Sequence, residues 1–254
     1  MITPVNRETL SQIRNPAFVA YASMYVDIYE NFMRQIEQVG LEIEPESDRP
    51  QVLALMEQLR QKGAIFRNDD KSIYLNEISP ACVACQTGIG SAPFFVSLRC
   101  HRDCFYCFNP NQEDYEFFQT HQRNVTEELR QVHAAGQKIK QLALTGGEPL
   151  VHKQETIEFF DYASEHFPTT YKRLYTTGDQ ADAETLKQLA DAGLDEIRLS
   201  IRMHDLERGH RHTFDRVALA QQYIPRVMIE MPILPGTLDE MKDVLLELER
   251  LKLY

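Results

Sequence analysis

The chain has 254 residues, of which 43% are hydrophobic, so it is long enough to bury a sizeable core as one or two domains. No apolar run is long enough to span a bilayer and no signal peptide opens the sequence, so we predict a cytoplasmic protein without membrane segments. The net charge of −11, from 27 basic and 38 acidic residues, argues against broad binding to nucleic acids or anionic membranes. Small molecules or peptides are the expected partners.

Residues 1–92 are predicted to form a mainly helical region that contains a β-hairpin. Helical spacing of apolar residues predicts helices over residues 18–40 and 50–63, and two β-prone segments around an Asn-Asp-Asp-Lys turn predict a hairpin over residues 64–76. The first helix carries an apolar stripe of Tyr25, Ile28, Tyr29 and Phe32. A helix followed by a hairpin is typical of a winged-helix module, which would recognise a peptide. The alternative is an extension that packs on the next domain.

Residues 93–254 alternate short apolar strands with helical segments. The predicted strands cover residues 93–100, 141–147, 172–178, 195–202 and 226–234. The predicted helices cover residues 126–136, 154–167, 183–193 and 237–253. Repeated strand-helix units predict an α/β fold with a parallel sheet, closed in part like a TIM barrel, whose ligands gather at the carboxyl ends of the strands.

Three of the five cysteines, Cys100, Cys104 and Cys107, follow the first predicted strand at the spacing C-x3-C-x2-C. In a reducing compartment, clustered cysteines indicate a metal site or catalysis rather than structural disulfides. Zinc prefers four ligands in structural sites, and His101 offers a fourth. A four-iron four-sulfur cluster on three thiolates would instead leave one iron open to a substrate or cofactor. The residues alone leave both interpretations open.

A second motif follows the next strand, where the sequence Leu-Thr-Gly-Gly-Glu-Pro contains Gly146, Gly147 and Glu148. The cysteine spacing, Tyr106 immediately before the last cysteine and this Gly-Gly-Glu-Pro motif together resemble the radical S-adenosylmethionine (SAM) superfamily. The resemblance covers residues 93–254 and implies a partial (β/α) TIM-like barrel. The family's usual barrel has six strand-helix units, whereas this sequence ends after the fifth, so we predict a barrel core that is incomplete at its carboxyl terminus.

The resemblance also implies a mechanism. Cys100, Cys104 and Cys107 would bind a 4Fe-4S cluster that reductively cleaves SAM to methionine and a 5′-deoxyadenosyl radical, which abstracts hydrogen from a substrate. A one-electron reductant such as flavodoxin or ferredoxin would be required, and the chemistry would be oxygen-sensitive. The alternatives to this enzyme are an iron-sulfur electron-transfer protein and a zinc-binding interaction protein.

The same resemblance implies contacts with SAM. Gly146 and Gly147 permit close approach of the backbone to a ligand, and Glu148 can accept hydrogen bonds from the ammonium group. Tyr106 and Phe108 would border the adenine.

Residues at the ends of later strands are further candidates. Arg202 would pair with the SAM carboxylate and Ser200 would hydrogen-bond to the carboxylate or the ribose, the alternative for Arg202 being a surface ion pair. Thr176 and Thr177 also end a strand, although a β-branched strand end needs no function. Ile233 or Leu234 would contact the adenine or pack in the core.

The remaining cysteines, Cys82 and Cys85, form a C-x2-C motif. They fit part of a zinc site, part of a second iron-sulfur cluster, a redox dithiol or two buried thiols. Candidate partners are the histidines of a polar segment, which is alternatively solvated: His204, His210 and His212. For the substrate, we predict a peptide or protein, with a small molecule as the alternative.

Overall fold

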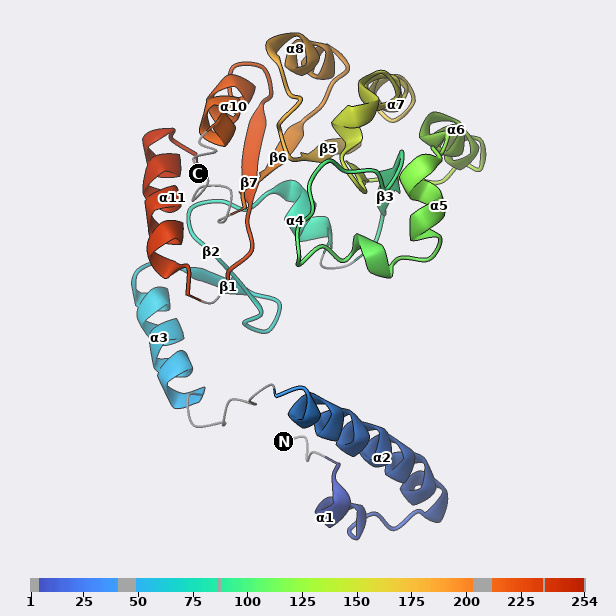
Figure 1. Cartoon of the computed structure of the whole chain (residues 1–254), viewed down its shortest axis with the longest axis vertical. Coiled ribbons are helices and arrows are strands. Elements are labelled where there is room, and N and C mark those ends of the chain that lie inside the picture. The colour runs from blue at the N-terminus through green and yellow to red at the C-terminus, as the bar shows by residue number, and fades with distance from the viewer. Residues whose placement is uncertain (1–4, 41–48, 86–87, 203–211, 235, 254) are drawn as a thin grey trace. The chain divides into compact units, whose positions relative to one another are not determined.

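The computed structural model describes residues 5–40, 49–85, 88–202, 212–234 and 236–253 (Figure 1). The chain divides into two compact units, Met1–Gly63 and Ala64–Tyr254. The predicted hairpin and the C-x2-C motif therefore belong to the same unit as the strands that follow them. The predicted division into residues 1–92 and 93–254 stays a prediction.

The described residues of the first unit form the helices α1 (Arg7–Leu10), α2 (Pro16–Gln38) and α3 (Arg49–Gln61), which include the two predicted ones. Helix α2 begins at Pro16 because the side chain of Asn15 accepts a hydrogen bond from the Phe18 amide (3.1 Å) and proline suits the first helical position. Only Ala22 and Val26 of α2 are buried, whereas the predicted apolar stripe is exposed.

The predicted hairpin is confirmed. Strand β1 (Ile65–Arg67) pairs antiparallel with β2 (Ser72–Tyr74), and Asn68, Asp69 and Asp70 in the turn have φ values of 55°, 51° and 65°. Asn and Asp adopt this left-handed conformation more readily than other non-glycine residues. Helix α4 (Pro80–Cys85) follows and contains Cys82 and Cys85. The winged-helix interpretation stays a prediction.

The five predicted strands form one parallel sheet in chain order, β3 to β7. Their bounds are β3 Ser91–Phe95, β4 Gln141–Thr145, β5 Tyr171–Thr176, β6 Glu196–Ser200 and β7 Arg226–Glu230. The prediction that the first strand continues to Cys100 is wrong. After Phe95 the backbone bonds elsewhere: the Val96 carbonyl accepts from the Arg123 amide (2.7 Å), and the Leu98 amide donates to the Phe118 carbonyl (2.9 Å).

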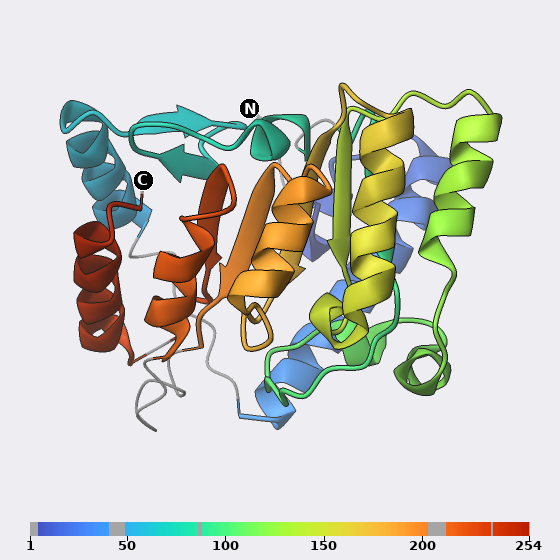
Figure 2. The ribbon, with the colours of Figure 1, turned by 90° about the horizontal axis from the view of Figure 1, so that it is seen from above.

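The main core lies between this sheet and the helices outside it. The helices are α6 (Val125–Ala134), α7 (Lys153–His166), α8 (Ala183–Asp191), α10 (His212–Ala220) and α11 (Leu238–Arg250), and Figure 2 shows them along the sheet. Alternate strand residues such as Leu144, Leu174 and Ile197 are fully buried against helix residues such as Phe159 and Leu189. The intervening strand residues therefore face the inner side of the curved sheet.

Helix α4 closes the amino end of that inner side. The Ser79 hydroxyl before it donates to Glu196 at the start of β6 (2.6 Å), and Gln141 at the start of β4 donates to the Pro80 carbonyl (3.3 Å). Figure 1 shows α4 on the opposite side of the sheet from α7 and α8. The loops at the carboxyl ends of the strands thus remain for ligands.

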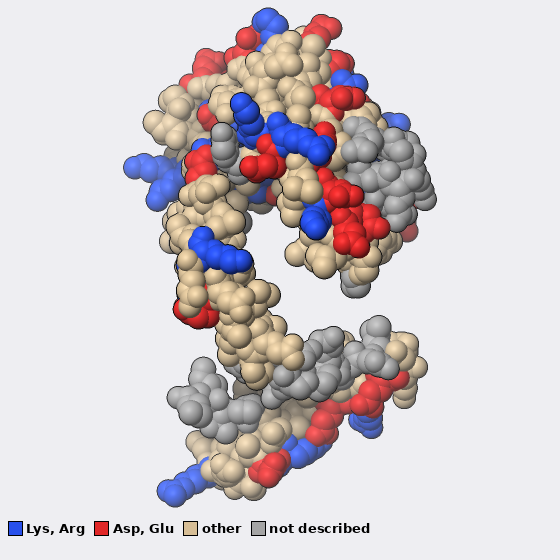
Figure 3. All heavy atoms as spheres, turned by 90° about the vertical axis from the view of Figure 1, so that its left-hand side faces the viewer, with Lys and Arg blue, Asp and Glu red and all other residues tan. Residues whose placement is uncertain are grey.

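The surface shows no gathering of charge by sign on the face drawn in Figure 3, where the described Lys and Arg side chains lie among Asp and Glu. Among the described helices, none combines the length and the apolarity that crossing a membrane would require.

Candidate active site

The three clustered cysteines lie in the loop between β3 and the short 3₁₀ helix η2 (Asn109–Asn111). All three are free, and the Cys107 amide donates to the Cys104 carbonyl (2.9 Å). Burial raises the pKa of the Cys100 thiol; the Arg102 amide lowers it, while the nearby charges of Glu148, Cys104 and Cys107 raise it again. Cys100 is therefore partly buried among the other two cysteines of the loop and Glu148 of the second motif.

The two glycines of the second motif lie against both flanks of the cysteine loop. The Gly147 amide donates to the Ser97 carbonyl (3.1 Å), the Glu148 amide to the Arg99 carbonyl (2.8 Å), and the Asn109 side-chain amide to the Gly146 carbonyl (2.7 Å). A Cβ atom on Gly147 would lie 2.1 Å from the Arg99 carbonyl oxygen, and Gly146 has a φ of +109°. In this structure the glycines permit close approach of two segments of the same chain.

Glu148 lies beneath this turn and is 1% exposed. Its Oε1 atom accepts hydrogen bonds from the Leu150 amide (3.0 Å) and the Thr176 hydroxyl (2.6 Å), and its Oε2 atom accepts one from the Thr177 amide (2.6 Å). The carboxylate therefore joins the carboxyl end of β4 to that of β5. Its predicted contact with an ammonium group stays a prediction.

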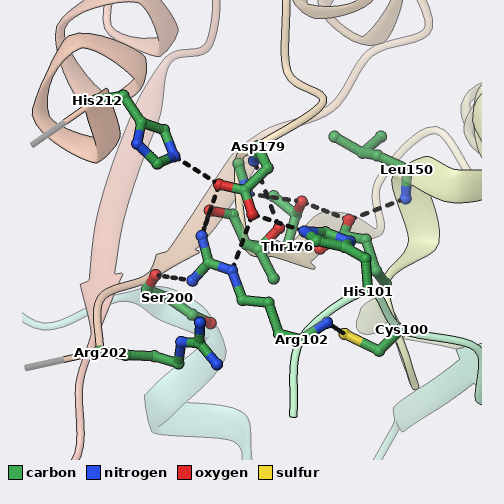
Figure 4. A network of polar contacts seen from close by, with 12 residues as sticks. Cys100, His101, Arg102, Leu150, Thr176, Asp179, Ser200, Arg202 and His212 are labelled. Carbon is green, nitrogen blue, oxygen red and sulfur yellow. Dashed lines mark hydrogen bonds and ion pairs between the residues drawn. The ribbon is translucent and has the colours of Figure 1, made fainter. Parts of the chain in front are cut away.

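An ion pair that the sequence did not reveal fixes the middle of the cysteine loop (Figure 4). Arg102, whose side chain is 6% exposed, donates from Nε and Nη2 to the two oxygens of Asp179, at 2.8 Å and 2.6 Å. The same guanidinium reaches the carbonyls of Thr177 and Ser200, both at 3.4 Å. Such a two-pronged contact defines position and orientation together. Arg102 thus connects the loop to the ends of β5 and β6.

Asp179 also lies within hydrogen-bond distance of two histidines (Figure 4). The Nε2 atom of His101 lies 2.6 Å from Oδ2, and the Nε2 atom of His212 lies 2.9 Å from Oδ1. Burial would raise the pKa of Asp179, but the hydrogen bonds with Arg102, His101 and His212 outweigh it and hold this pKa well below its usual range. The only sequence signal was an acidic residue directly after the Thr-Thr-Gly that ends a strand.

Arg202 reaches the cysteine loop from the segment after β6. It is 9% exposed, and its Nη1 atom lies 3.4 Å from the Cys104 sulfur and 3.6 Å from Oδ1 of Asp103. A cation therefore lies next to one of the three thiols. The predicted contacts of Arg202 and Ser200 with SAM stay predictions.

The candidate adenine contacts lie at the surface. Tyr106, Phe108 and Ile233 are 37%, 73% and 84% exposed, and the ring of Tyr106 lies edge-on to that of Phe105, with 5.1 Å between the centroids. Leu234 instead packs against the small core cluster that includes Phe214. Core packing thus accounts for Leu234 but not for Ile233.

Cys82 lies apart from this site, next to the amino end of the sheet. Its sulfur accepts a hydrogen bond from Nη2 of Arg198 on β6 (3.2 Å). Among the partners considered for a second metal site, His212 contacts Asp179, whereas His204 and His210 lie outside the described residues. A role for Cys82 and Cys85 in metal binding or redox chemistry stays a prediction.

The chain is similar in sequence and fold to several known proteins. The family model of the radical SAM superfamily matches residues 94–248. A protein of Methanocaldococcus jannaschii, assigned as a glycyl-radical enzyme activating enzyme, is 26% identical over 172 residues, which are 65% of this chain and 45% of that protein. The chain spans less than half the length of this relative.

Solved structures of SuiB from Streptococcus suis share the fold. The structure bound to precursor peptide SuiA has a TM-score of 0.51 and 14% identity over 90% of this chain and 51% of that one. The structure bound to S-adenosylmethionine has a TM-score of 0.50 and 13% identity over 92% and 51% of the two chains.

Proposed function

Because the chain belongs to the radical SAM superfamily, we propose that it is an enzyme that cleaves SAM reductively and uses the resulting radical on a substrate. The proposal depends on three hydrogen bonds between this motif and the flanks of the cysteine loop: the Gly147 and Glu148 amides donate to loop carbonyls, and the Gly146 carbonyl accepts from Asn109. These bonds hold the family's two motifs together at the carboxyl end of the sheet, where ligands of such folds bind.

Cys100, Cys104 and Cys107 are the proposed ligands of a 4Fe-4S cluster. The family model that matches the chain covers the cysteine loop and supports a cluster rather than zinc. A four-iron cluster takes each thiolate on a different iron, and three thiolates leave the fourth iron open. The three free cysteines fall within eight residues and would supply those thiolates.

When bound, the cluster supplies the electron that cleaves SAM to methionine and the 5′-deoxyadenosyl radical, which then takes a hydrogen atom from the substrate. The residues of the chain would position the cluster and SAM. The Arg102–Asp179 pair orients the cysteine loop, and Glu148 fixes the neighbouring strand ends. A one-electron reductant such as flavodoxin or ferredoxin would deliver the electron.

The proposed SAM contacts lie at the carboxyl ends of neighbouring strands. The turn at Gly146 and Gly147 is proposed to face the methionine part of SAM, and Arg202, Ser200 and Thr176 lie at or just after the ends of the neighbouring strands. The exposed side chains of Tyr106, Phe108 and Ile233 would cover the adenine, which would bury them on binding.

A peptide or protein is the proposed substrate. Support comes from the glycyl-radical enzyme activating enzyme among the relatives and from the SuiB structure that holds a precursor peptide. Cys82 and Cys85 are proposed as part of a second metal or redox site, for zinc or a second iron-sulfur cluster.

The test is anaerobic reconstitution with iron and sulfide, followed by incubation with dithionite and SAM. We expect a brown protein that forms 5′-deoxyadenosine, and we expect Cys104→Ala to lose both properties. Gln137→Ala is the control, because Gln137 is an exposed residue before β4, at the amino end of the sheet, and belongs to no proposed site. A colourless wild-type protein that retains stoichiometric zinc would contradict the proposal.

A further inference from the structure

One arginine inside the curved sheet lacks the partner that a buried charge normally has. Arg173, in the middle of β5, is 6% exposed, and its Nε atom has neither solvent contact nor a hydrogen-bond partner. Throughout the part of the chain that the structure describes, the side chain of Arg173 forms no hydrogen bond and no ion pair. Burial of an unpaired charge is strongly unfavourable, so buried arginines are normally paired. The exception points to a ligand.

The side chain of Arg173 faces the inner side of the sheet. Its neighbour Leu174 is fully buried in the core on the helix side, so Arg173 and Tyr175 face the opposite side. The Arg173 guanidinium carbon lies 5.4 Å from the centroid of the Tyr175 ring. The residues in register with Arg173 are Ala143 on β4, which has a short side chain, and Glu196 on β6.

Arg198, on the same inner face, is a buried arginine that does have carboxylate partners. Arg198 lies 5.2 Å from the centroid of the Tyr175 ring and donates to Glu196 and Glu230, both at 2.6 Å. Glu196 is further engaged by the hydroxyls of Ser79 (2.6 Å) and Tyr171 (2.9 Å). Glu196 is in register with Arg173 on the adjoining strand, but its carboxylate is bonded to Arg198 and to the two hydroxyls. Within the described residues, the Arg173 guanidinium therefore has no carboxylate at ion-pair distance.

The hydroxyl of Tyr175 adds a donor next to this charge. No hydrogen bond of this hydroxyl is found within the described residues. Burial raises the pKa of Tyr175, with Arg198 and Arg173 partly offsetting the effect, so the phenol keeps its proton at neutral pH. A guanidinium and a phenol proton thus face the same inner space.

We propose that Arg173 and Tyr175 bind an anionic oxygen group, a carboxylate or a phosphate, of the substrate. The planar guanidinium fork matches the geometry of both groups, and the phenol donates one further hydrogen bond. The inference rests on the proposed function, because it places the substrate on the inner side of the sheet, between α4 and the cysteine loop. The anionic end of the substrate would lie on β5 and its reacting part toward the carboxyl ends of the strands.

The experiment measures unfolding of the full chain, with and without the reconstituted cluster, in inorganic phosphate, acetate or chloride at constant ionic strength. We expect phosphate or acetate to stabilise the wild type. At an anion concentration of ten times Kd, mass action raises the folding equilibrium constant about elevenfold. The anion that acts identifies the group as phosphate or carboxylate.

Three variants make the test specific. Arg173→Met should lose the anion effect and, without anions, should be at least as stable as the wild type, because it removes a buried unpaired charge. Tyr175→Phe keeps the ring and should weaken anion binding about tenfold, the loss of one strong hydrogen bond. Arg226→Met is the control, because Arg226 on β7 already pairs with Glu77 (3.3 Å), and it should respond like the wild type.

Two results would overturn the anion site: a wild type that neither anion stabilises, and an Arg173→Met variant that still responds. The same measurements distinguish a failure of the anion site from a failure of the proposed function. Anion binding by a wild type that makes no 5′-deoxyadenosine would contradict the radical chemistry alone. Formation of 5′-deoxyadenosine without anion binding would contradict this site alone.

Discussion

The carboxyl and amino ends of the parallel sheet both contain buried carboxylates, but these carboxylates have different partners. At the carboxyl end, Glu148 accepts hydrogen bonds from two backbone amides and one hydroxyl, and no cationic side chain pairs with it among the described residues. At the amino end, Glu196 is paired with Arg198 and receives two hydroxyls. The hydrogen bonds of Glu148 hold the loops of the proposed active site in position. Those of Glu196 hold the strands of the sheet and the segment before α4 together. Substitutions at the two ends should therefore have separable effects.

The largest effect on stability is expected from Glu196→Gln at the amino end. This change leaves Arg198 buried with a weaker partner, and breaking a buried pair costs about 4 kcal/mol. Urea unfolding measures the loss. The folded fraction should still form 5′-deoxyadenosine at the wild-type rate. A variant that is fully stable but inactive would show that the amino end also serves the chemistry.

Gly147→Ala should be the most damaging change at the carboxyl end. The added Cβ would lie 2.1 Å from the Arg99 carbonyl oxygen, so the backbone must move, at a cost of about 3 kcal/mol. Iron content after reconstitution should fall with stability, because the same contact positions the cysteine loop. Gly136→Ala is the control: it has positive φ but open space, so it should cost about 1 kcal/mol and keep its iron.

Asp179→Asn should affect chemistry more than stability. It removes the charge that Arg102, His101 and His212 share, at a cost of about 2 kcal/mol. The cysteine loop loses its anchor, so 5′-deoxyadenosine formation should fall about a hundredfold, as for small misplacements of reacting groups. The electron paramagnetic resonance spectrum of the reduced cluster with SAM should change as well. Asp215→Asn, an exposed position on α10, should leave rate and spectrum unchanged.

Asp182→Ala, at the first turn of α8, should have the smallest effect. Asp182 caps α8 by accepting from the Thr185 amide (2.8 Å), and Lys153 donates to it (2.7 Å). Loss of the cap costs about 1 kcal/mol. The hydrogen bond from Lys153, followed by that from Thr185, holds the pKa of Asp182 below its usual range. The contribution is therefore complete above the unfolded pKa of about 4 and is lost as the pH falls below it.

Urea titrations at several pH values check the sign. The difference between wild type and Asp182→Ala should be constant from neutral pH down to mildly acidic pH and should shrink below the unfolded pKa. Asp182→Asn keeps the capping oxygen and loses the charge, so its smaller deficit should narrow over the same range. A deficit that grows on acidification would contradict the assignment.

Much of the fold of the second unit could be predicted because short segments of sequence indicate its strands and helices. Apolar runs such as that around Leu174 identified all five strands, and the order of strands and helices predicted a parallel sheet. Helix α10 was missed because the polar residues before it obscured the helical spacing of Phe214, Val217 and Ala220. The end of β3 was misplaced because extended backbone continues beyond Phe95 without ladder partners.

The polar architecture of the site was not predictable in the same way. The contact of Arg102 with Asp179 joins residues 77 positions apart, and nothing in either local segment indicates the other. Arg173 lies in a strand of mixed polarity, where alternation with Leu174 indicates which side it faces but not whether it has a partner. The spacing of residues along one segment therefore predicts which face of a helix or strand is buried. Ion pairs between distant segments can be assigned only once the fold is known.

The strand order has a consequence for how the molecule forms. Each strand of the sheet pairs with the strand that precedes it in the chain, so most contacts join neighbouring segments and the sheet can grow from β3 to β7 during synthesis. The flanks of the cysteine loop obtain their partners once Gly147 has emerged from the ribosome, Arg102 obtains its partner with Asp179, and His212 completes the set. The loop that would receive the iron thus becomes more ordered stepwise as the chain lengthens.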